Sequence, residues 1–138
     1  MNAGNALTRV NWTRWVVWIG RVVSLWPVYV LTSSATWKLT REPWYVAEWQ
    51  RIGYDDAMLL TIGIVQVTCL LLYIVPQTSV LGTVLLTGYL GGAIASYARM
   101  GEPSPILVPL STSLTAWLGL YLREPRLWTL LPLRFGRS

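Results

Sequence analysis

AMLLTIGIVQVTCLLLYIV, residues 57–75, is the stretch that decides the fold, because it carries no charge and is long enough to cross a bilayer as a helix. Three more apolar stretches have similar lengths. The four predicted spans cover residues 15–37, 57–75, 80–98 and 106–122. The sequence therefore predicts an all-α integral membrane protein.

The composition favours the same class. Charged residues make up 12% of the 138 residues, about half the usual share of a soluble domain, and 54% are hydrophobic. The chain has no histidine and one cysteine, Cys69, which excludes histidine-ligated metals, Ser-His-Asp catalysis and a disulfide framework. We therefore predict no catalytic residue, no metal site and no required cofactor, with lipid or quinone as the candidate bound molecules.

The links between the predicted spans indicate the topology. Residues 76–79 and 101–105 form short turns, which favour antiparallel neighbours and a transmembrane four-helix up-down bundle. The link between the first and second spans is longer and contains Trp44 and Trp49 among polar residues. It predicts a short amphipathic helix within residues 43–52, between helices 1 and 2 in the sequence, that lies along the non-cytoplasmic membrane interface. A loop anchored by aromatic side chains is the alternative.

Basic residues indicate the orientation and the partners. Residues 1–14 are expected to form a cytoplasmic N-terminal tail, residues 15–123 the transmembrane domain and residues 124–138 a basic cytoplasmic tail. More arginines flank the side of the termini than the opposite side, so both termini are predicted to be cytoplasmic, in a bacterial inner membrane. The net charge of +5 comes from residues that flank apolar runs. The expected partners are therefore membrane lipids and other membrane subunits, with no nucleic acid.

Three residues with polar or reactive side chains lie inside the predicted spans. Arg21 is an intramembrane charge, and we interpret it as snorkelling to the interface or pairing with Glu124, with a functional role as the alternative. Gln66, near the middle of the second span, either bonds across helices or lines a pocket. Cys69 is interpreted as a small packing residue.

Small residues in the third span predict a close helix contact. Gly88, Gly92 and Ser96 form one row, and Gly91 and Ala95 form a second row beside it. Such rows let another helix approach closely, and we expect that helix to belong to the same chain, with a partner chain as the alternative. Replacing Gly92 by leucine is expected to disrupt this packing.

Four segments together resemble the DoxX-like family of small four-helix membrane proteins. They are residues 20–27 (GRVVSLWP) with Trp37-Lys38-Leu39, residues 46–54 (VAEWQRIGY), residues 87–95 (TGYLGGAIA) with Arg99 and Gly101, and residues 117–127 (WLGLYLREPRL). The resemblance implies the four-helix fold. The family takes its name from a subunit of a quinone-reducing complex, which implies a quinone site around Gln66, Tyr89 and Tyr97. Relatives often have an acidic residue at the position of Gln66 and a histidine near Ser96 and Tyr97.

Three functions remain open at this point. The leading one is a non-catalytic accessory subunit or assembly factor of a larger respiratory or photosynthetic membrane complex. It fits the missing histidines and carboxylates, because proton-coupled chemistry needs groups that titrate near neutral pH. The alternatives are a membrane subunit of a quinone-linked oxidoreductase and a small-molecule permease, although four short helices enclose little space.

Overall fold

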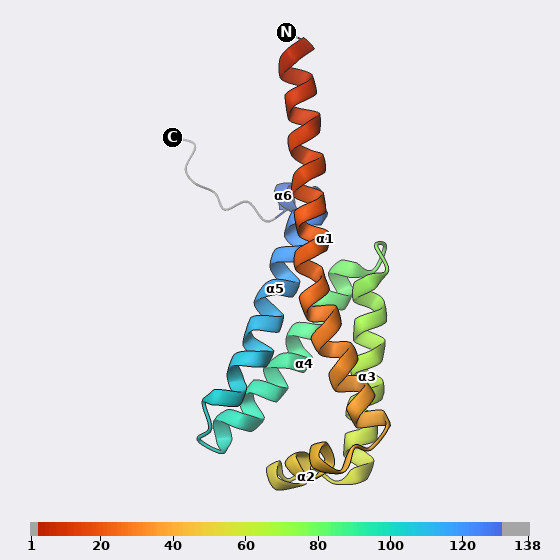
Figure 1. Cartoon of the computed structure of the whole chain (residues 1–138), viewed down its shortest axis with the longest axis vertical. Helices are drawn as coiled ribbons and strands as arrows, with labels where there is room; N and C mark the ends of the chain where they lie inside the picture. The colour runs from red at the N-terminus through yellow and green to blue at the C-terminus, as the bar shows by residue number, and fades with distance from the viewer. Residues whose placement is uncertain (1–2, 131–138) are drawn as a thin grey trace.

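The computed structural model describes residues 3–130, with side chains from residue 11 to residue 129. This part of the chain consists of helices and loops, without a strand (Figure 1). The helices are α1 (Ala3–Leu39), α2 (Pro43–Ile52), α3 (Asp56–Ile74), α4 (Ser79–Arg99), the 3-10 helix η1 (Ser104–Ile106), α5 (Leu107–Arg123) and α6 (Leu127–Leu130). The predicted all-α class is confirmed.

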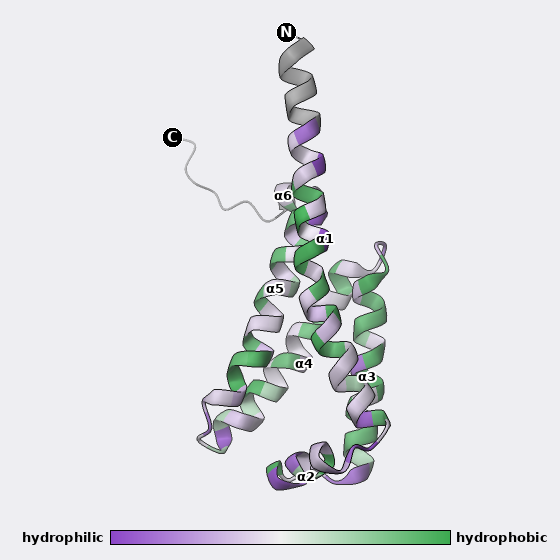
Figure 2. Cartoon of the chain, in the orientation of Figure 1, coloured by the Kyte–Doolittle hydropathy of each residue, from purple (hydrophilic) through white to green (hydrophobic). Residues whose placement is uncertain are grey.

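Four of these helices are long and apolar enough to cross a membrane. The candidate spans are Asn11–Leu39, Asp56–Ile74, Ser79–Arg99 and Ser104–Arg123. Hydrophobic residues run along α3, α4 and α5, whereas polar residues gather at α2 and in the turn between α4 and α5 (Figure 2). The chain is therefore an integral membrane protein with four spans, as its sequence predicts.

The four long helices form a ring in which neighbours along the chain run antiparallel. α1 packs against α3 and α5, and α4 packs against the same two helices from the other side. The short helix α2 lies across the end of the bundle that also carries the turn between α4 and α5, whereas the α3–α4 turn lies towards the opposite end (Figure 1). This arrangement is the predicted up-down bundle.

Local signals explain where α2 and α3 begin and end. Pro43 stands in the first turn of α2, where a missing backbone N–H costs nothing. α2 ends at Gly53, whose φ of 101° is the left-handed conformation that favours glycine. Asp55 then caps α3 by accepting a hydrogen bond of 2.7 Å from the backbone N–H of Met58. The helix predicted within residues 43–52 is therefore confirmed, and its position at a membrane interface stays a prediction.

α1 is longer than its predicted span. It begins at Ala3 and ends at Leu39, so its 37 residues extend over about 55 Å, compared with about 30 Å for the hydrocarbon core of a bilayer. Most of the segment expected as an N-terminal tail, residues 1–14, therefore continues the first helix. Beyond residue 130, the predicted C-terminal tail lies outside the described residues.

Helices approach closely at glycines other than those predicted. A Cβ added to Gly82 would collide with the backbone of Leu72 and Tyr73, and one added to Gly119 would collide with Ser24. Around Gly88, Gly91 and Gly92, by contrast, no described atom lies within 4 Å of an added Cβ. Gly88, Gly91 and Gly92 therefore do not make the contact within the chain that was predicted for them, because α4 turns these three glycines away from α3 and α5. Contact with a partner chain stays a prediction.

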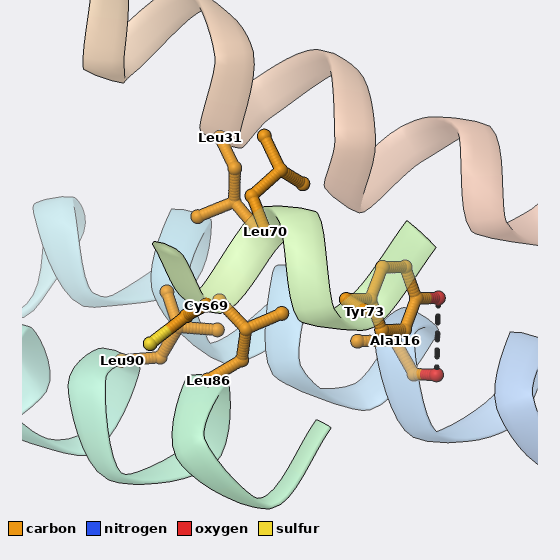
Figure 3. Close-up of a cluster of buried hydrophobic side chains, with 7 residues drawn as sticks. All are labelled: Leu31, Cys69, Leu70, Tyr73, Leu86, Leu90 and Ala116. Atoms are coloured by element: carbon orange, nitrogen blue, oxygen red, sulfur yellow. Dashed lines mark hydrogen bonds between the residues drawn. The ribbon is translucent and has the colours of Figure 1, made fainter. Parts of the chain in front are cut away.

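A buried cluster holds the bundle together beside the site described below. It contains side chains from four helices: Leu31, Cys69, Leu70, Tyr73, Leu86, Leu90 and Ala116 (Figure 3). Cys69 lies inside this cluster, which agrees with its predicted role as a small packing residue. Cys69 lies one turn from Gln66 on α3, and Leu90 directly follows Tyr89 on α4, so the cluster fixes helices that carry polar residues of the site.

Candidate functional site

Gln66 joins three helices through its side-chain amide. Its Nε2 donates a hydrogen bond of 2.8 Å to the backbone oxygen of Leu31 on α1. Its Oε1 accepts two hydrogen bonds, one of 2.6 Å from Lys38 Nζ and one of 2.7 Å from the hydroxyl of Tyr89 on α4. The side chain is completely buried. Gln66 therefore fulfils both predicted roles, because it bonds across helices and also lines a pocket.

Lys38 is the centre of this network. It stands in the last turn of α1, and only 2% of its surface is exposed. Its ammonium group donates three hydrogen bonds, to Ser34 Oγ at 3.0 Å, to Gln66 Oε1 and to the Tyr89 hydroxyl at 2.9 Å. Three is the full donor capacity of an ammonium group. The long side chain is therefore turned inward and held in one position.

Aromatic rings surround the ammonium group. Lys38 Nζ lies 5.0 Å from the centre of the Trp49 ring and 5.6 Å from the centres of the Tyr45 and Tyr89 rings. The negative face of an aromatic ring attracts a cation at such distances, most strongly where water is excluded. Trp49 and Tyr45 both come from α2. The short helix therefore closes the site from the end of the bundle.

Tyr45 also takes part in the hydrogen bonding. Its hydroxyl lies 2.9 Å from Ser34 Oγ, so that Tyr45, Ser34 and Lys38 form a chain of polar contacts from α2 to α1. Burial raises the pKa of the Tyr45 phenol above its ordinary value, so the phenol remains protonated near neutral pH. It can therefore act as a hydrogen-bond donor to the site.

A pocket of about 400 Å³ opens beside these residues. Its walls come from the second half of α1, from α2, from the middle of α3, from the second half of α4, from η1 and from the beginning of α5. Lys38, Gln66, Tyr89 and Tyr97 line it together with mostly apolar side chains, including Leu90 and Val108. A mainly apolar cavity with a few convergent polar groups is the usual form of a small-molecule site.

Sequence reasoning selected three of these residues and missed the most important one. Gln66, Tyr89 and Tyr97 were predicted as hydrogen-bonding residues of a quinone site, and the structure brings all three to one pocket. Lys38 entered the sequence analysis only as part of the Trp37-Lys38-Leu39 segment that resembles the family, without a predicted role in a site. It is the only lysine of the chain, and an aromatic segment follows it directly. A single lysine directly before an aromatic segment is the sequence feature that could have indicated this role.

A sequence profile of the DoxX-like family matches residues 22–119. The chain belongs to the DoxX-like family. The match contains the whole pocket, from Tyr29 to Thr112. No curated protein and no solved structure matches the chain.

Salt bridges fasten α2 of this DoxX-like chain over the pocket. Arg51 on α2 bonds to Glu102, in the turn between α4 and α5, at 2.6 Å, and to Glu48 at 2.7 Å. These contacts lower the pKa of the Glu102 carboxyl and raise the pKa of Arg51. We call Arg51, Glu48 and Glu102 the Arg51 clasp.

Two further contacts on the same side support the clasp. Arg99 donates a hydrogen bond of 3.1 Å to the backbone oxygen of Ile52, at the end of α2. The Tyr54 hydroxyl lies 2.6 Å from Ser96 Oγ on α4. Ser96, expected in a helix-packing row, therefore contacts the segment that follows α2. Together these contacts keep Tyr45 and Trp49 over the pocket.

Arg21 lies in the middle of α1, about 25 Å along the helix from Lys38, and does not line the pocket. Its side chain is exposed, and its guanidinium carbon lies 5.7 Å from the centre of the Trp18 ring. Glu124 forms its ion pair with Arg126, at 4.0 Å, and not with Arg21. The exposed position is compatible with snorkelling towards the membrane surface.

Proposed function

We propose that this DoxX-like chain is a non-catalytic subunit of a larger membrane complex and that it binds the head of a quinone-class compound in the Lys38 pocket. The observation that carries this proposal is the convergence of the Lys38 ammonium, the Gln66 amide and the Tyr89 hydroxyl on one apolar pocket. A quinone presents carbonyl oxygens on a flat apolar ring, and such an oxygen accepts a hydrogen bond from the Lys38 ammonium in exchange for the contact with Ser34. The ring fits an aromatic pocket.

In this proposal, the chain binds the quinone, and a partner subunit carries out the electron transfer. The pocket is lined by an ammonium, an amide and hydroxyls, which orient a carbonyl. Its size of about 400 Å³ lies in the range of about 300–1,000 Å³ that is typical for small-molecule sites. The pocket lies between candidate spans, so a ligand dissolved in the bilayer has a short path to it. The chain thus holds the ring for chemistry performed elsewhere.

Binding of a short-chain quinone to the purified chain in lipid nanodiscs tests the proposal. Wild type is expected to bind decylubiquinone or a short-chain menaquinone saturably. The double variant Gln66→Leu with Tyr97→Phe is expected to bind at least about tenfold more weakly, because it loses polar groups at the pocket wall. Thr68→Val is the matched control, since Thr68 is an exposed residue of α3 whose hydroxyl bonds to its own helix. Absence of saturable binding to wild type would overturn the proposal.

A second candidate function, an accessory subunit without a ligand, is favoured by the open face of α4. Gly88, Gly91 and Gly92 leave space for another helix backbone. Under this hypothesis, Gly92→Leu releases the chain from its complex in mild detergent while the isolated chain keeps its thermal stability. Retention of Gly92→Leu in a stoichiometric complex would exclude this surface as the contact.

A further inference from the structure

The ammonium group of Lys38 is buried among neutral partners. Its three hydrogen bonds go to a serine hydroxyl, an amide oxygen and a phenol, none of which carries a negative charge at neutral pH. The hydrogen-bonding capacity of the ammonium is therefore satisfied, whereas its charge is not compensated. A buried charge is normally paired with an opposite charge, because removal from water is costly.

The chain's six acidic side chains do not reach this site. Glu48 and Glu102 bind Arg51, and Asp56 binds Arg41. Asp55 caps α3, and Glu124 lies near Arg126. The remaining one, Glu42, precedes α2 and is not among the residues that line the pocket.

The surroundings attract a cation without neutralising it. The last turn of a helix carries partial negative charge from its free carbonyls, and Lys38 stands in the last turn of α1. The rings of Trp49, Tyr45 and Tyr89 add the attraction of their faces. These are partial charges, so the ammonium form of Lys38 leaves a positive potential inside a low-dielectric pocket, and an anion bound beside it stabilises that form.

We infer that the Lys38 pocket selects a ligand whose head carries a negative charge on oxygen, attached to an apolar ring or chain. An ionised hydroxyl on a quinone and the carboxylate of a long-chain acid share this chemistry. The inference rests on the proposed function, because it specifies the charge of the ligand in the same pocket. Ser34 is the contact that such an oxygen replaces, since Ser34 Oγ keeps Tyr45 as a partner.

Three ligands compared on the wild-type chain in nanodiscs test this inference. The first is a 2-hydroxy-3-alkyl-1,4-naphthoquinone, which is ionised at neutral pH. The second is its methyl ether, which has the same ring and tail without the charge. The third is a fatty acid with a similar number of carbon atoms. The visible absorption of the ionised hydroxyquinone reports both its binding and its displacement.

The hydroxyquinone is expected to bind at least about tenfold more tightly than its methyl ether at pH 7, because a hydrogen bond between two charged groups is stronger than one to a neutral acceptor. The difference should disappear at a pH that protonates the hydroxyquinone, and in Lys38→Met. Arg41→Gln, which removes an exposed positive charge three residues away, should keep it. Displacement by the fatty acid extends the ligand class to carboxylates, and failure to displace restricts it to ring hydroxyls.

This experiment distinguishes failure of the inference about charge from failure of the proposed quinone site. If the methyl ether binds as tightly as the hydroxyquinone, the inference about charge is wrong while the proposed quinone site remains. If neither ring compound binds saturably, the proposed function is wrong as well. The comparison of the two ring compounds uses wild type only, so it stays decisive even where Lys38→Met does not fold.

Discussion

Individual polar side chains connect the helices of this bundle at two levels. Towards the α3–α4 turn, the Tyr73 hydroxyl donates to Ser24 Oγ at 3.1 Å or to the backbone oxygen of Ala116 at 3.3 Å. Nearer α2, Gln66 and Lys38 make the corresponding connections. Hydrogen bonds between membrane helices each contribute roughly 0.5–2 kcal/mol, so a few such residues decide which helices pair.

Tyr73→Phe tests the first of these levels. The ring is completely buried, so phenylalanine keeps the packing and removes only the hydroxyl. We expect a loss of about 1 kcal/mol in the free energy of unfolding, measured in detergent micelles. Tyr29→Phe is the control, because the side chain of Tyr29 is largely exposed. Equal stability of Tyr73→Phe and wild type would show that the bond contributes nothing.

Tyr89→Phe is expected to cost more than Tyr73→Phe. The variant removes an acceptor from the Lys38 ammonium and a donor to Gln66. Hydrogen bonds to charged groups contribute more than those between neutral groups, so we expect a loss of about 2 kcal/mol, measured in the same unfolding assay. A smaller loss for Tyr89→Phe than for Tyr73→Phe would contradict the central role of Lys38.

Residue patterns predicted part of this site. An amide in the middle of an apolar span, as at Gln66, must find a partner, and its sequence position shows this directly. Lys38 gives no such signal, because a lysine at the end of a span normally reaches the aqueous phase. It turns inward here because α2 folds back over it and replaces water by aromatic rings. That depends on tertiary structure, which hydropathy does not contain.

At the level of elements, polar contacts attach α2 to α4 and to the turn after α4, in addition to its buried side chains Trp49 and Ile52. The Arg51 clasp, the Arg99 bond to Ile52 and the pair of Tyr54 with Ser96 fasten it to α4 and the following turn. The helix itself was predictable from Pro43 and the two tryptophans. Its partners were not, because Glu102 lies 51 positions from Arg51 in the sequence.

The attachment of α2 is expected to weaken at acidic pH. Arg51 lowers the pKa of Glu102 below its ordinary value of 4.5. The clasp therefore contributes fully above that value, and its contribution is lost as the pH falls through the lowered pKa. Hydrogen exchange of the α2 amides, corrected for intrinsic rates, should accelerate at the acidic end. Glu102→Gln should show fast exchange already at neutral pH, whereas Glu42→Gln should behave like wild type.

Glycine substitutions distinguish positions of α4 that pack against another helix of the bundle from positions that face open space. Gly82→Ala is expected to destabilise the chain by about 1–3 kcal/mol, because its Cβ would collide with the backbone of α3. Gly92→Ala should leave stability unchanged, since that position faces open space. Unfolding of both variants in detergent measures the difference. Equal effects would mean that α4 is turned differently about its axis.

Glycine spacing alone could not distinguish these positions. The pattern of Gly88, Gly91 and Gly92 identifies a face where a helix can approach, whereas the row of Gly82 continues with the large residue Leu86 four positions later. Which face meets α3 depends on the rotation of α4 in the ring. In a membrane, apolar residues cover the lipid-facing and the protein-facing sides alike, so composition gives no second indication.

At the level of the whole molecule, the antiparallel ring places α2 and the α4–α5 turn on one side of the membrane and the start of α1 on the other. The count of basic residues predicts that the side with the termini is cytoplasmic. Green fluorescent protein fused to the C-terminus should therefore fluoresce, and alkaline phosphatase inserted after Arg41 should be active. The reverse pattern of the two reporters would invert the orientation and place the Arg51 clasp in the cytoplasm.

The position of Lys38 has a practical consequence for labelling chemistry. Apart from the amino terminus, its ammonium is the only primary amine of the chain, and it is buried beneath α2. Reagents that acylate amines should therefore leave the folded interior untouched until α2 moves away. The rate at which a membrane-permeant succinimidyl ester modifies Lys38 then reports how often the pocket opens, because Lys38 is the only side chain that such a reagent acylates as an amine.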